Sequence, residues 1–536
     1  MKNRSILIGL DGATFHLLDP LMQDGTMPFL KEFVESGVRG NLLSVIPPLT
    51  PPAWTSLMTG VNPGNHGIFD FFQKEKGGLH IRFTTHHDVR SETIWSIADR
   101  QNAKITTLNF PLMMPPPEIN GYVISGGWMT WRQIRLGCHP EDLYERVKAL
   151  PGFNARELAM DMSHEEKALE GCRLDEYEEW IRMHIGREEQ WMNILKYLMR
   201  KDPCELTAIL FDGVDKIQHL CWRFLSPKYL NGDMSVQEQR IRNLCLEYFS
   251  KLDRILLEIN ELAGPDARII MASDHGFGAQ TQTFFVNSWL AQNGYLSWAK
   301  KGKSKENRSG GLGMSQLSKH VYMIDWEKTL AYASTPSSNG IHIVMEDKDH
   351  KNGVALTEYK QFRDELVEKL YGVTNPVTGK AVVSRVWTRE EAFNGPYTEL
   401  APDLTMILGD GGLISILNSD EPVRQRDETA GTHRMEGVIM ARGPGVCQGK
   451  SVDAVSILDV APLILYTLGM EIPKQMEGRM PSEIFEVSYL QANPVKDSGD
   501  FEIRESVHWE ESERMVYDEE AEAAMAERLR ALGYIE

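Results

Sequence analysis

Two short segments of the sequence combine carboxylate and imidazole side chains in a way that suits metal binding. The segment DGVDKIQH contains Asp215 and His219, which are four residues apart and would share one face of a helical turn. The segment MASDHGFG places Asp274 and His275 side by side after an apolar run. Each pattern also fits an ordinary structural role, as a solvated helix pair or as a turn that ends a strand.

Two further segments supply side chains of the same kind. Asp11 ends the apolar run in IGLDG, and His433 lies in a Gly- and Thr-containing loop before another apolar run. A single loop histidine is usually a surface residue. Several carboxylates at one place repel each other unless a cation compensates them, so the combination favours a metal site more than any one member does.

Thr50 is the candidate nucleophile. It precedes Pro51 in PPLTPPAWTSL, and because proline is favoured at the first helical position, Thr50 is predicted to be the N-cap of a helix that runs to about Thr59. Capping alone would explain the residue. A hydroxyl at a helix N-terminus also feels positive potential, which helps an alkoxide to form and a phosphoryl group to dock. Activation of threonine would still need a bound dication.

The elements that must position these residues alternate along the chain. Short β-rich apolar runs are separated by stretches with helical spacing, which predicts an α/β architecture with a largely parallel sheet. The runs are Ser5–Leu10, Ile105–Leu108, Leu206–Phe211, Arg268–Ala272, Leu404–Leu408 and Val438–Ala441, and the helical stretches include Met27–Glu35, Ser235–Leu262, Leu356–Leu370 and Ser456–Leu468.

Ligands of parallel sheets bind at the carboxyl ends of the strands. Asp11, Asp212 and Asp274 each follow one of the predicted strands directly or nearly so, and we therefore expect them to lie where chemistry occurs. Asp212 competes with Asp215 as a ligand, but only Asp215 has the four-residue offset to His219.

We divide the chain into a catalytic domain, 1–490, and an acidic C-terminal tail with a short helix, 491–536. A segment rich in Met, Trp, Glu and Arg, at about 112–200, is expected to be a helical insertion. A second insertion, at about 300–396, begins with a stretch of Lys, Ser and Gly that is typical of a loop.

The composition limits the classes of function. The net charge of −19 argues against binding to a nucleic-acid polymer, and the six cysteines form no CxxC pair. No run approaches the roughly 20 apolar residues that cross a bilayer, and the N-terminal run lacks the features of a signal peptide. We expect a cytoplasmic protein without a membrane partner, whereas the oligomeric state cannot be inferred.

Taken together, and in this order, the five motifs around Asp11, Thr50, Asp215, Asp274 and His433 resemble the alkaline phosphatase superfamily, in its type I phosphodiesterase and nucleotide pyrophosphatase branch. The resemblance extends from Ser5 to about Phe485 and includes the closing segment ILDVAPLILYTLGMEIPKQMEGR. It implies a three-layer αβα sandwich with a largely parallel central sheet and helical insertions.

The resemblance also implies a metal-dependent hydrolase of phosphate esters, either a phosphodiesterase or a phosphomonoesterase, which acts on a small phosphorylated substrate through a phosphothreonine at Thr50. Two divalent metal ions would be bound, and a ligand set of nitrogen and oxygen suits Zn²⁺, with Mn²⁺ as an alternative. The implied ligands are Asp215, His219 and His433 for one ion, and Asp11, Asp274, His275 and Thr50 for the other.

The sequence departs from the nucleotide pyrophosphatase pattern beside the nucleophile. The position after the nucleophile typically offers a backbone N–H to the phosphoryl group, and an Asn two positions further adds a second donor, but here these positions are Pro51 and Ala53. Other groups must then contact the phosphoryl oxygens. Proximity to the motifs suggests Asn109, Lys216, His66 and Arg223, although each could equally be a packing or surface residue.

Two other functions are compatible with the same residues. A phosphomutase or phosphotransferase would pass the phosphoryl group from Thr50 to a second hydroxyl, and a non-catalytic protein would keep the metals and recognise a partner. Substrate specificity would depend on the insertions, where Trp128, Trp131, Arg132, Asn339 and His342 could line the pocket or be structural.

Overall fold

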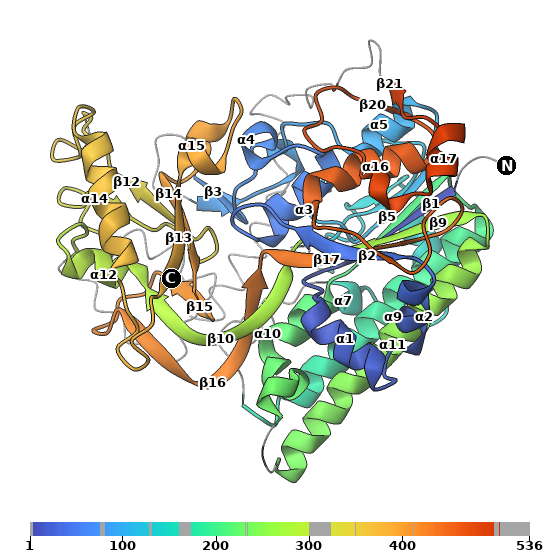
Figure 1. Cartoon of the computed structure of the whole chain (residues 1–536), viewed down its shortest axis with the longest axis horizontal. Coiled ribbons are helices and arrows are strands. Elements are labelled where there is room, and N and C mark those ends of the chain that lie inside the picture. The colour runs from blue at the N-terminus through green and yellow to red at the C-terminus, as the bar shows by residue number, and fades with distance from the viewer. Residues whose placement is uncertain are drawn as a thin grey trace.

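A ten-stranded sheet forms the centre of the molecule (Figure 1). The computed structural model describes residues 4–74, 81–127, 131–159, 173–230, 232, 234–299, 323–348, 350–409, 411–497 and 503. In spatial order the strands are β18 (Lys450–Ser451), β2 (Val38–Leu43), β17 (Glu436–Arg442), β9 (Ala267–Ala272), β1 (Arg4–Leu10), β8 (Leu206–Phe211), β5 (Ile105–Leu108), β6 (Gly121–Ile124) and β7 (Cys138–His139), with β19 (Val455–Ser456) beside β2.

The sheet is mostly parallel. The ladders from β9 through β1, β8 and β5 to β6 are all parallel, whereas β17 and β7 run antiparallel to their neighbours. The predicted α/β class with a largely parallel sheet is therefore confirmed.

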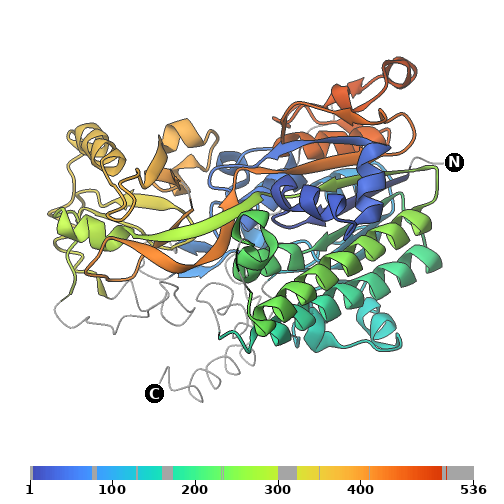
Figure 2. The same ribbon diagram turned by 60° about the horizontal axis from the view of Figure 1, so that its bottom comes forward.

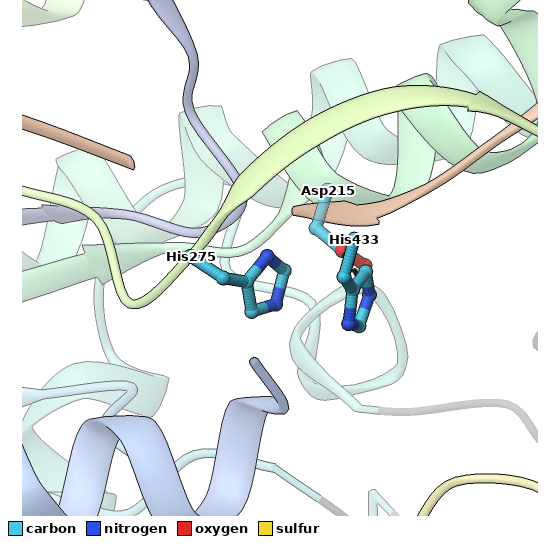
Figure 3. A group of neighbouring side chains, drawn as sticks. All are labelled: Asp215, His275 and His433. Carbon is cyan, nitrogen blue, oxygen red and sulfur yellow. Dashed lines mark ion pairs between the residues drawn. The ribbon is translucent and has the colours of Figure 1, made fainter. Parts of the chain in front are cut away.

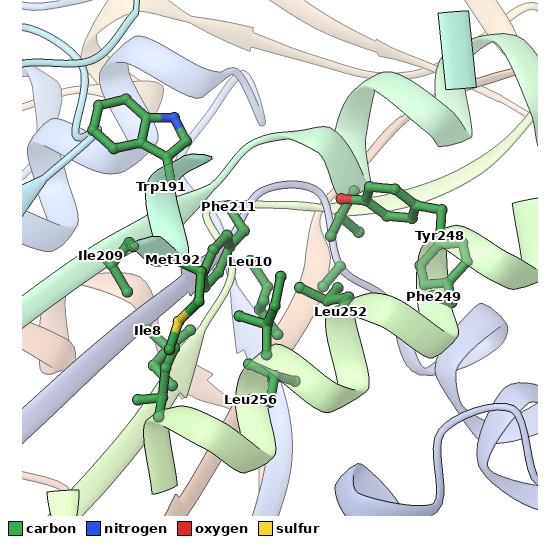
Figure 4. Packing of buried hydrophobic residues seen from close by; sticks show 14 of the residues in the cluster. Ile8, Leu10, Trp191, Met192, Ile209, Phe211, Tyr248, Phe249, Leu252 and Leu256 are labelled. Carbon is green, nitrogen blue, oxygen red and sulfur yellow. The ribbon is translucent and has the colours of Figure 1, made fainter. Parts of the chain in front are cut away.

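Helices cover both faces because successive side chains of a strand point to opposite sides. In β1, Ile6 and Ile8 join one hydrophobic core, whereas Leu7 joins the other. The first core is completed by α1 (Phe15–Gln23), α2 (Pro28–Glu35), α9 (Tyr177–Lys201), α10 (Gly213–Leu225) and α11 (Val236–Ala263). Figure 4 shows the packing of α9 and α11 residues against this face. The second core is completed by α3 (Thr50–Thr59), α5 (Ile94–Arg100) and α16 (Val460–Thr467).

A second lobe extends from the sheet on a long antiparallel ribbon of β10 (Gly276–Phe285) and β16 (Val423–Arg434) (Figures 1 and 2). The lobe has a hydrophobic core of its own. Its elements are β15 (Gly412–Ser415), β11 (Ala331–Tyr332), β12 (Gly340–Ile343), β14 (Leu404–Leu408), β13 (Val383–Thr388), α12 (Val286–Gln292), α14 (Tyr359–Tyr371) and α15 (Arg389–Ala392).

The remaining elements are short. They are α4 (Pro63–His66), α6 (Leu143–Lys148), α7 (Ala155–Leu158), α17 (Val487–Ala492), β3 (Phe72–Lys74), β4 (Ile81–Phe83), β20 (Glu471–Ile472) and β21 (Lys496–Asp497), together with 3-10 turns at His86–Asp88, Pro227–Tyr229, Thr398–Leu400, Ile457–Asp459 and Ser482–Ile484. None of the helices in the described part of the chain is both long and apolar enough to span a bilayer.

Several sequence expectations change in detail. The stretch at 112–200 contributes β6 and β7 to the central sheet, and its long helix α9 covers one face of that sheet. Leu404–Leu408 is a strand, as expected, but belongs to the second lobe. The described part of the stretch at 300–396 lies in that lobe, whereas the predicted tail helix falls outside the described residues.

Candidate metal centre and nucleophile

The candidate ligands meet at one edge of the central sheet. β9, β1 and β8 are adjacent and parallel, and their last residues pair in register, Gly9 with Ala272 and Leu10 with Phe211. The segments that follow these strands therefore leave the sheet together. Asp11 follows β1, Asp274 follows β9, and α10 begins after β8.

Asp215, His219 and His433 form one cluster. Asp215 and His219 occupy consecutive turns of α10, as predicted, with 3.3 Å between Asp215 Oδ1 and His219 Nε2. His433, from β16 of the ribbon, brings its Nε2 to 3.2 Å from the same carboxylate oxygen and 3.0 Å from His219 Nε2. The ribbon thus adds a ligand that is distant in sequence from α10.

Asp11, Asp274 and His275 form the second cluster. His275 Nε2 lies 3.2 Å from Asp274 Oδ2 and 3.6 Å from Asp11 Oδ1. The His275 ring also stacks on His433, with 3.7 Å between the ring centroids (Figure 3). Ligand atoms of Asp215, His275 and His433 lie within 4.8 Å of one another, as do those of Asp11, Asp274 and His275. His275 therefore borders both clusters.

The tautomers of the three imidazoles leave Nε2 free to bind a metal. Nδ1 faces a backbone carbonyl in each ring, that of Gly431 for His219, Pro48 for His433 and Gly276 for His275, at 3.0–3.2 Å. A carbonyl only accepts, so Nδ1 must carry the proton and donate. Nε2 then holds a lone pair, which is the arrangement that metal-binding histidines adopt.

Unpartnered oxygens point to the same conclusion. Asp11 Oδ1, Asp215 Oδ1 and Asp274 Oδ2 are buried and have no hydrogen-bond partner within the described residues. In neutral rings, the Nε2 lone pairs of His219 and His433 would also face each other across 3.0 Å. Buried acceptors without donors are costly, and cations would satisfy them all. The residues therefore fit the two divalent ions that the sequence predicts.

Without a bound cation, the negative charges of the candidate ligands are not balanced. Burial and the neighbouring carboxylates raise the pKa of Asp11, and burial raises the pKa of Asp274 to about 8. Burial also acts on Asp215, but His219 and His433, when their rings carry a second proton, outweigh it and hold the pKa of this carboxyl well below its usual range. Burial, with His433 nearby, lowers the pKa of His275. A positive charge among these groups would relieve the repulsion between carboxylates.

Thr50 lies beside the second cluster. Its Oγ1 is 3.4 Å from His275 Nε2. The helix α3 begins as predicted, but Thr50 is its first residue and Leu49 is the N-cap, with no side-chain capping bond, so the predicted cap role is wrong. One turn further along α3, Trp54 Nε1 donates to Asp11 Oδ2 at 3.3 Å. Sequence reasoning missed Trp54, although its four-residue spacing from Thr50 places the two on one helix face.

A pocket of about 1190 Å³ opens over the centre between the main body and the second lobe. Thr50, Asp215 and His219 lie in its wall, and so do Trp222 and Phe277. The far wall comes from the second lobe and includes Ser337, Asn339, Asn375 and Lys380. The pocket can therefore hold a substrate considerably larger than a phosphoryl group.

Of the four predicted substrate contacts, only Lys216 lines this pocket. Asn109 is buried and donates to Leu210 O at 2.9 Å. His66 is buried as well, where its Nδ1 accepts from the Ile68 N–H and its Nε2 meets Ser56 Oγ at 2.8 Å. Arg223 faces Glu238 and Glu428 at 3.8 and 3.3 Å. The last three residues thus have structural partners away from the pocket.

The proposed specificity residues also separate. Asn339 lines the pocket, whereas His342 stacks on Tyr332, at 5.4 Å between ring centroids. Trp131 packs under the guanidinium of Arg132, at 4.9 Å, and neither lines the pocket. Trp128 lies outside the described residues.

A buried polar network behind α10 was also missed. Arg187 of α9 donates two hydrogen bonds to Asp212, at 3.0 and 3.2 Å, and Asn109 donates a third at 3.3 Å. Asp212 is thereby paired with Arg187 and Asn109, whereas Asp215 lies in the cluster of candidate ligands. The available signal was a charged residue at helical spacing from Trp180, Trp191 and Ile194, which are buried on the same helix.

The comparisons with known proteins agree with this geometry. A family model described as type I phosphodiesterase/nucleotide pyrophosphatase matches residues 5–437. No curated protein matches the sequence. Among solved structures, an inactive threonine-to-alanine variant of murine ectonucleotide pyrophosphatase/phosphodiesterase 5, in complex with AMP, has a TM-score of 0.51 at 13% identity and covers 90% of this chain and 100% of its own.

Two other structures are similar. Phosphonoacetate hydrolase from Sinorhizobium meliloti, in complex with phosphonoformate, has a TM-score of 0.51 at 16% identity and covers 87% of this chain and 95% of its own. Human ectonucleotide pyrophosphatase/phosphodiesterase 5 has a TM-score of 0.50 at 14% identity and covers 90% and 100%. These likenesses confirm the expected fold, an alkaline-phosphatase-like α/β sandwich.

Proposed function

Because the chain belongs to the type I phosphodiesterase/nucleotide pyrophosphatase family, we propose that it is a two-metal hydrolase of phosphate esters in which Thr50 is the nucleophile. The observation that carries the proposal is the convergence of unpartnered carboxylate oxygens and imidazole lone pairs beside one threonine hydroxyl. Asp11 Oδ1, Asp215 Oδ1 and Asp274 Oδ2 are buried and have no hydrogen-bond partner in the described part of the chain.

Asp215, His219 and His433 would hold one ion, and Asp11, Asp274, His275 and Thr50 would hold the other. This assignment follows from the family pattern. The donors are nitrogen and oxygen only, which suits Zn²⁺ and also Mn²⁺. When bound, such ions supply Lewis acidity that favours the alkoxide of Thr50 and stabilises a leaving oxygen.

Thr50 Oγ1 would attack phosphorus and displace the alcohol of the ester, so that one P–O bond forms as another breaks. The position of Thr50 as the first residue of α3 favours negative charge on this hydroxyl, because the N-terminal end of a helix is positive. Water would then attack phosphorus and break its bond to Thr50 Oγ1, which takes back a proton. The product is phosphate from a monoester, or a phosphate monoester from a diester. The pocket gives both reactants access to the hydroxyl.

The solved relatives support a role for threonine and for phosphorus-containing ligands. The murine structure is that of an inactive threonine-to-alanine variant with AMP, and the bacterial enzyme holds phosphonoformate. Thr50 is the threonine that the metal-ligand motifs surround in this chain.

The test compares Thr50→Ala with the wild type in assays of aryl phosphate monoesters and diesters, with metal content measured on the same samples. We expect Thr50→Ala to lose at least about 1000-fold in kcat while it keeps its metals. Thr357→Ala, at an exposed site in the second lobe, is the matched control and should behave as the wild type does. If Thr50→Ala still turned over the esters, Thr50 would not be the nucleophile. If the purified wild type contained no metal, the proposed metal centre would be wrong.

A further inference from the structure

We infer that Gln218 is a positioning residue for the second cluster of candidate ligands, although it lies on the helix that supplies the first. This role depends on the proposed function, since it concerns the metal ions of that hydrolase. Gln218 holds the backbone at Gly12, and Gly12 in turn holds the carboxylate of Asp274. The glutamine therefore acts on a metal ligand through two hydrogen bonds in series.

Each carboxylate of the second cluster binds the protein with one oxygen and leaves the other for a cation. Asp274 Oδ1 accepts from the Gly12 N–H at 3.1 Å, whereas Oδ2 is buried and has no hydrogen-bond partner among the described residues. Asp11 shows the same division, since Oδ2 accepts from Trp54 Nε1 and Oδ1 has no partner within that part of the chain. Hydrogen bonds to a metal-binding carboxylate orient the oxygen that faces the ion and tune the metal affinity.

Gly12 belongs to a tight turn that touches both clusters. The turn follows β1 and is closed by a hydrogen bond from the Ala13 N–H to Leu10 O at 3.1 Å. Gly12 has a φ of +65°, in the left-handed region that favours glycine. A β-carbon at this position would lie 2.9 Å from Phe277 Cδ2 and 3.3 Å from Asp215 Oδ1. The position of this turn therefore matters for the candidate ligands around it.

Gln218 fixes the carbonyl group of Gly12. Its Nε2 donates to Gly12 O at 2.8 Å and to Val214 O, within α10, at 3.2 Å. Both acceptors are carbonyl oxygens, so the amide must turn its nitrogen towards them. The side chain is fully buried. Loss of the amide would take this donor from a buried carbonyl, which is costly and favours a shift of the turn.

The place of Gln218 in α10 connects the two clusters. It lies three residues after Asp215 and one before His219, which both belong to the first cluster. The helix that carries these two candidate ligands thus also fixes the turn that orients Asp274. The bond to Val214 offers an alternative role, in which Gln218 only supports α10 and acts on the first cluster. The two roles predict different changes in metal binding.

The first measurement is the affinity for Zn²⁺, by calorimetric titration of metal-free protein in competition with a chelator. We expect the wild type to bind two ions. Gln218→Met, which removes the amide at similar length, should weaken the binding of one ion about 10-fold and that of the other less than about 2-fold. Gln239→Met, which removes an exposed amide on α11 that donates to Asn243, is the matched control and should leave both affinities unchanged.

The second measurement combines Gln218→Met with ligand variants to show which ion is affected. If Gln218 acts on Asp274 through Gly12, Gln218→Met should still weaken Zn²⁺ binding about 10-fold in Asp215→Asn but less than about 2-fold in Asp274→Asn. The reverse pattern would mean that Gln218 acts on the first cluster through α10, and it would overturn the inference. Equal losses in both backgrounds, or unchanged affinities in Gln218→Met, would overturn it as well.

Gln218→Asn provides a second variant in case Gln218→Met does not fold. It keeps the amide but is one methylene shorter, so its nitrogen cannot reach Gly12 O at hydrogen-bond distance. We expect Gln218→Asn to weaken the binding of one ion at least about 3-fold. Wild-type affinities in this variant would also overturn the inference. A wild type that binds no Zn²⁺ at all would instead refute the proposed function.

Discussion

The three imidazoles of the candidate centre are fixed by the backbone. Each Nδ1 donates to a carbonyl oxygen, which orients the ring and leaves Nε2 for a cation. Replacing one of these histidines by asparagine or glutamine would keep a polar group but lose this orientation. The centre therefore depends on backbone positions as well as on the ligands themselves.

The first prediction concerns metal removal. Chelation should lower the melting temperature of the wild type by several degrees or more, because binding to the folded state stabilises it. Asp215→Asn should hold less metal and show a smaller shift, because one ligand oxygen is replaced. Differential scanning calorimetry with metal analysis measures both effects.

The control for this prediction is Asp364→Asn, which changes an exposed carboxylate on α14. It should keep the wild-type metal content and the wild-type shift. A shift that is equal in Asp215→Asn and the wild type would contradict the ligand assignment.

At the level of single residues, the sequence predicted which carboxylates and imidazoles converge better than it predicted which polar residues line the pocket. The candidate ligands occur in motifs with recognisable residue types, and all six come together in space. Asn109 and His66 were chosen because they lie near the motifs in sequence, but their side chains turn into the protein towards Leu210 and Ser56. Which way a polar side chain turns depends on packing that no single-sequence pattern reveals.

At the scale of elements, the site exists because β9, β1 and β8 are neighbours. The apolar runs predicted each of these strands almost to the residue. Their order could not be predicted, because β8 and β9 are about 200 residues or more from β1 in the sequence and pair through long crossovers. The rule for the carboxyl ends of parallel strands selected Asp11, Asp212 and Asp274 before any order was known. Asp11 and Asp274 lie in the second cluster, whereas Asp212 is paired with Arg187.

The ion pair of Arg187 with Asp212 should stabilise the junction between β8 and α10. Arg187→Met would leave the carboxylate of Asp212 without its main partner at a side chain only 13% exposed. We expect a loss of about 3 kcal/mol in the free energy of unfolding, measured by urea denaturation of the metal-loaded protein.

The double variant Arg187→Met/Asp212→Asn separates the pair from general disruption. Its loss in the free energy of unfolding should be smaller than the sum of the losses in the two single variants by at least about 1 kcal/mol. The reason is that the double variant has no uncompensated charge. Additive losses would show that the two side chains act independently and that α10 is not held by this pair.

At the scale of the molecule, the pocket is made by two lobes that meet beside α4. Phe69 packs edge-on against Phe393 of the second lobe, with 5.0 Å between ring centroids. Asp70 accepts hydrogen bonds from Thr335 at 2.5 Å and Ser337 at 2.6 Å. The sequence indicated insertions but not a lobe that starts at β10, because a ribbon continuous with the central body has no linker composition.

The buried position of Asp70 predicts how the free energy of unfolding depends on pH. Burial raises the pKa of Asp70 to about 6, in spite of the hydrogen bonds from Ser337 and Thr335. The folded state therefore keeps its proton at pH values where the unfolded state has lost it, so this group lowers stability as the pH rises from about 4 to 6. The change amounts to about 3 kcal/mol.

Asp70→Asn cannot ionise and should lack this change. The difference in unfolding free energy between Asp70→Asn and the wild type should therefore move by up to about 3 kcal/mol in favour of the variant between pH 4 and pH 7. Urea denaturation at several pH values provides the measurement. A difference that stays constant with pH would contradict the raised pKa of Asp70.

The most direct test of the whole account is to trap the phosphorylated protein. Metal-loaded wild type is mixed with an aryl phosphate, quenched in acid within milliseconds, digested and analysed by mass spectrometry. We expect a peptide that carries phosphate on Thr50, absent from Thr50→Ala and present in Thr357→Ala. Rapid turnover of the ester with no phosphate on Thr50, or with phosphate on another residue, would contradict it.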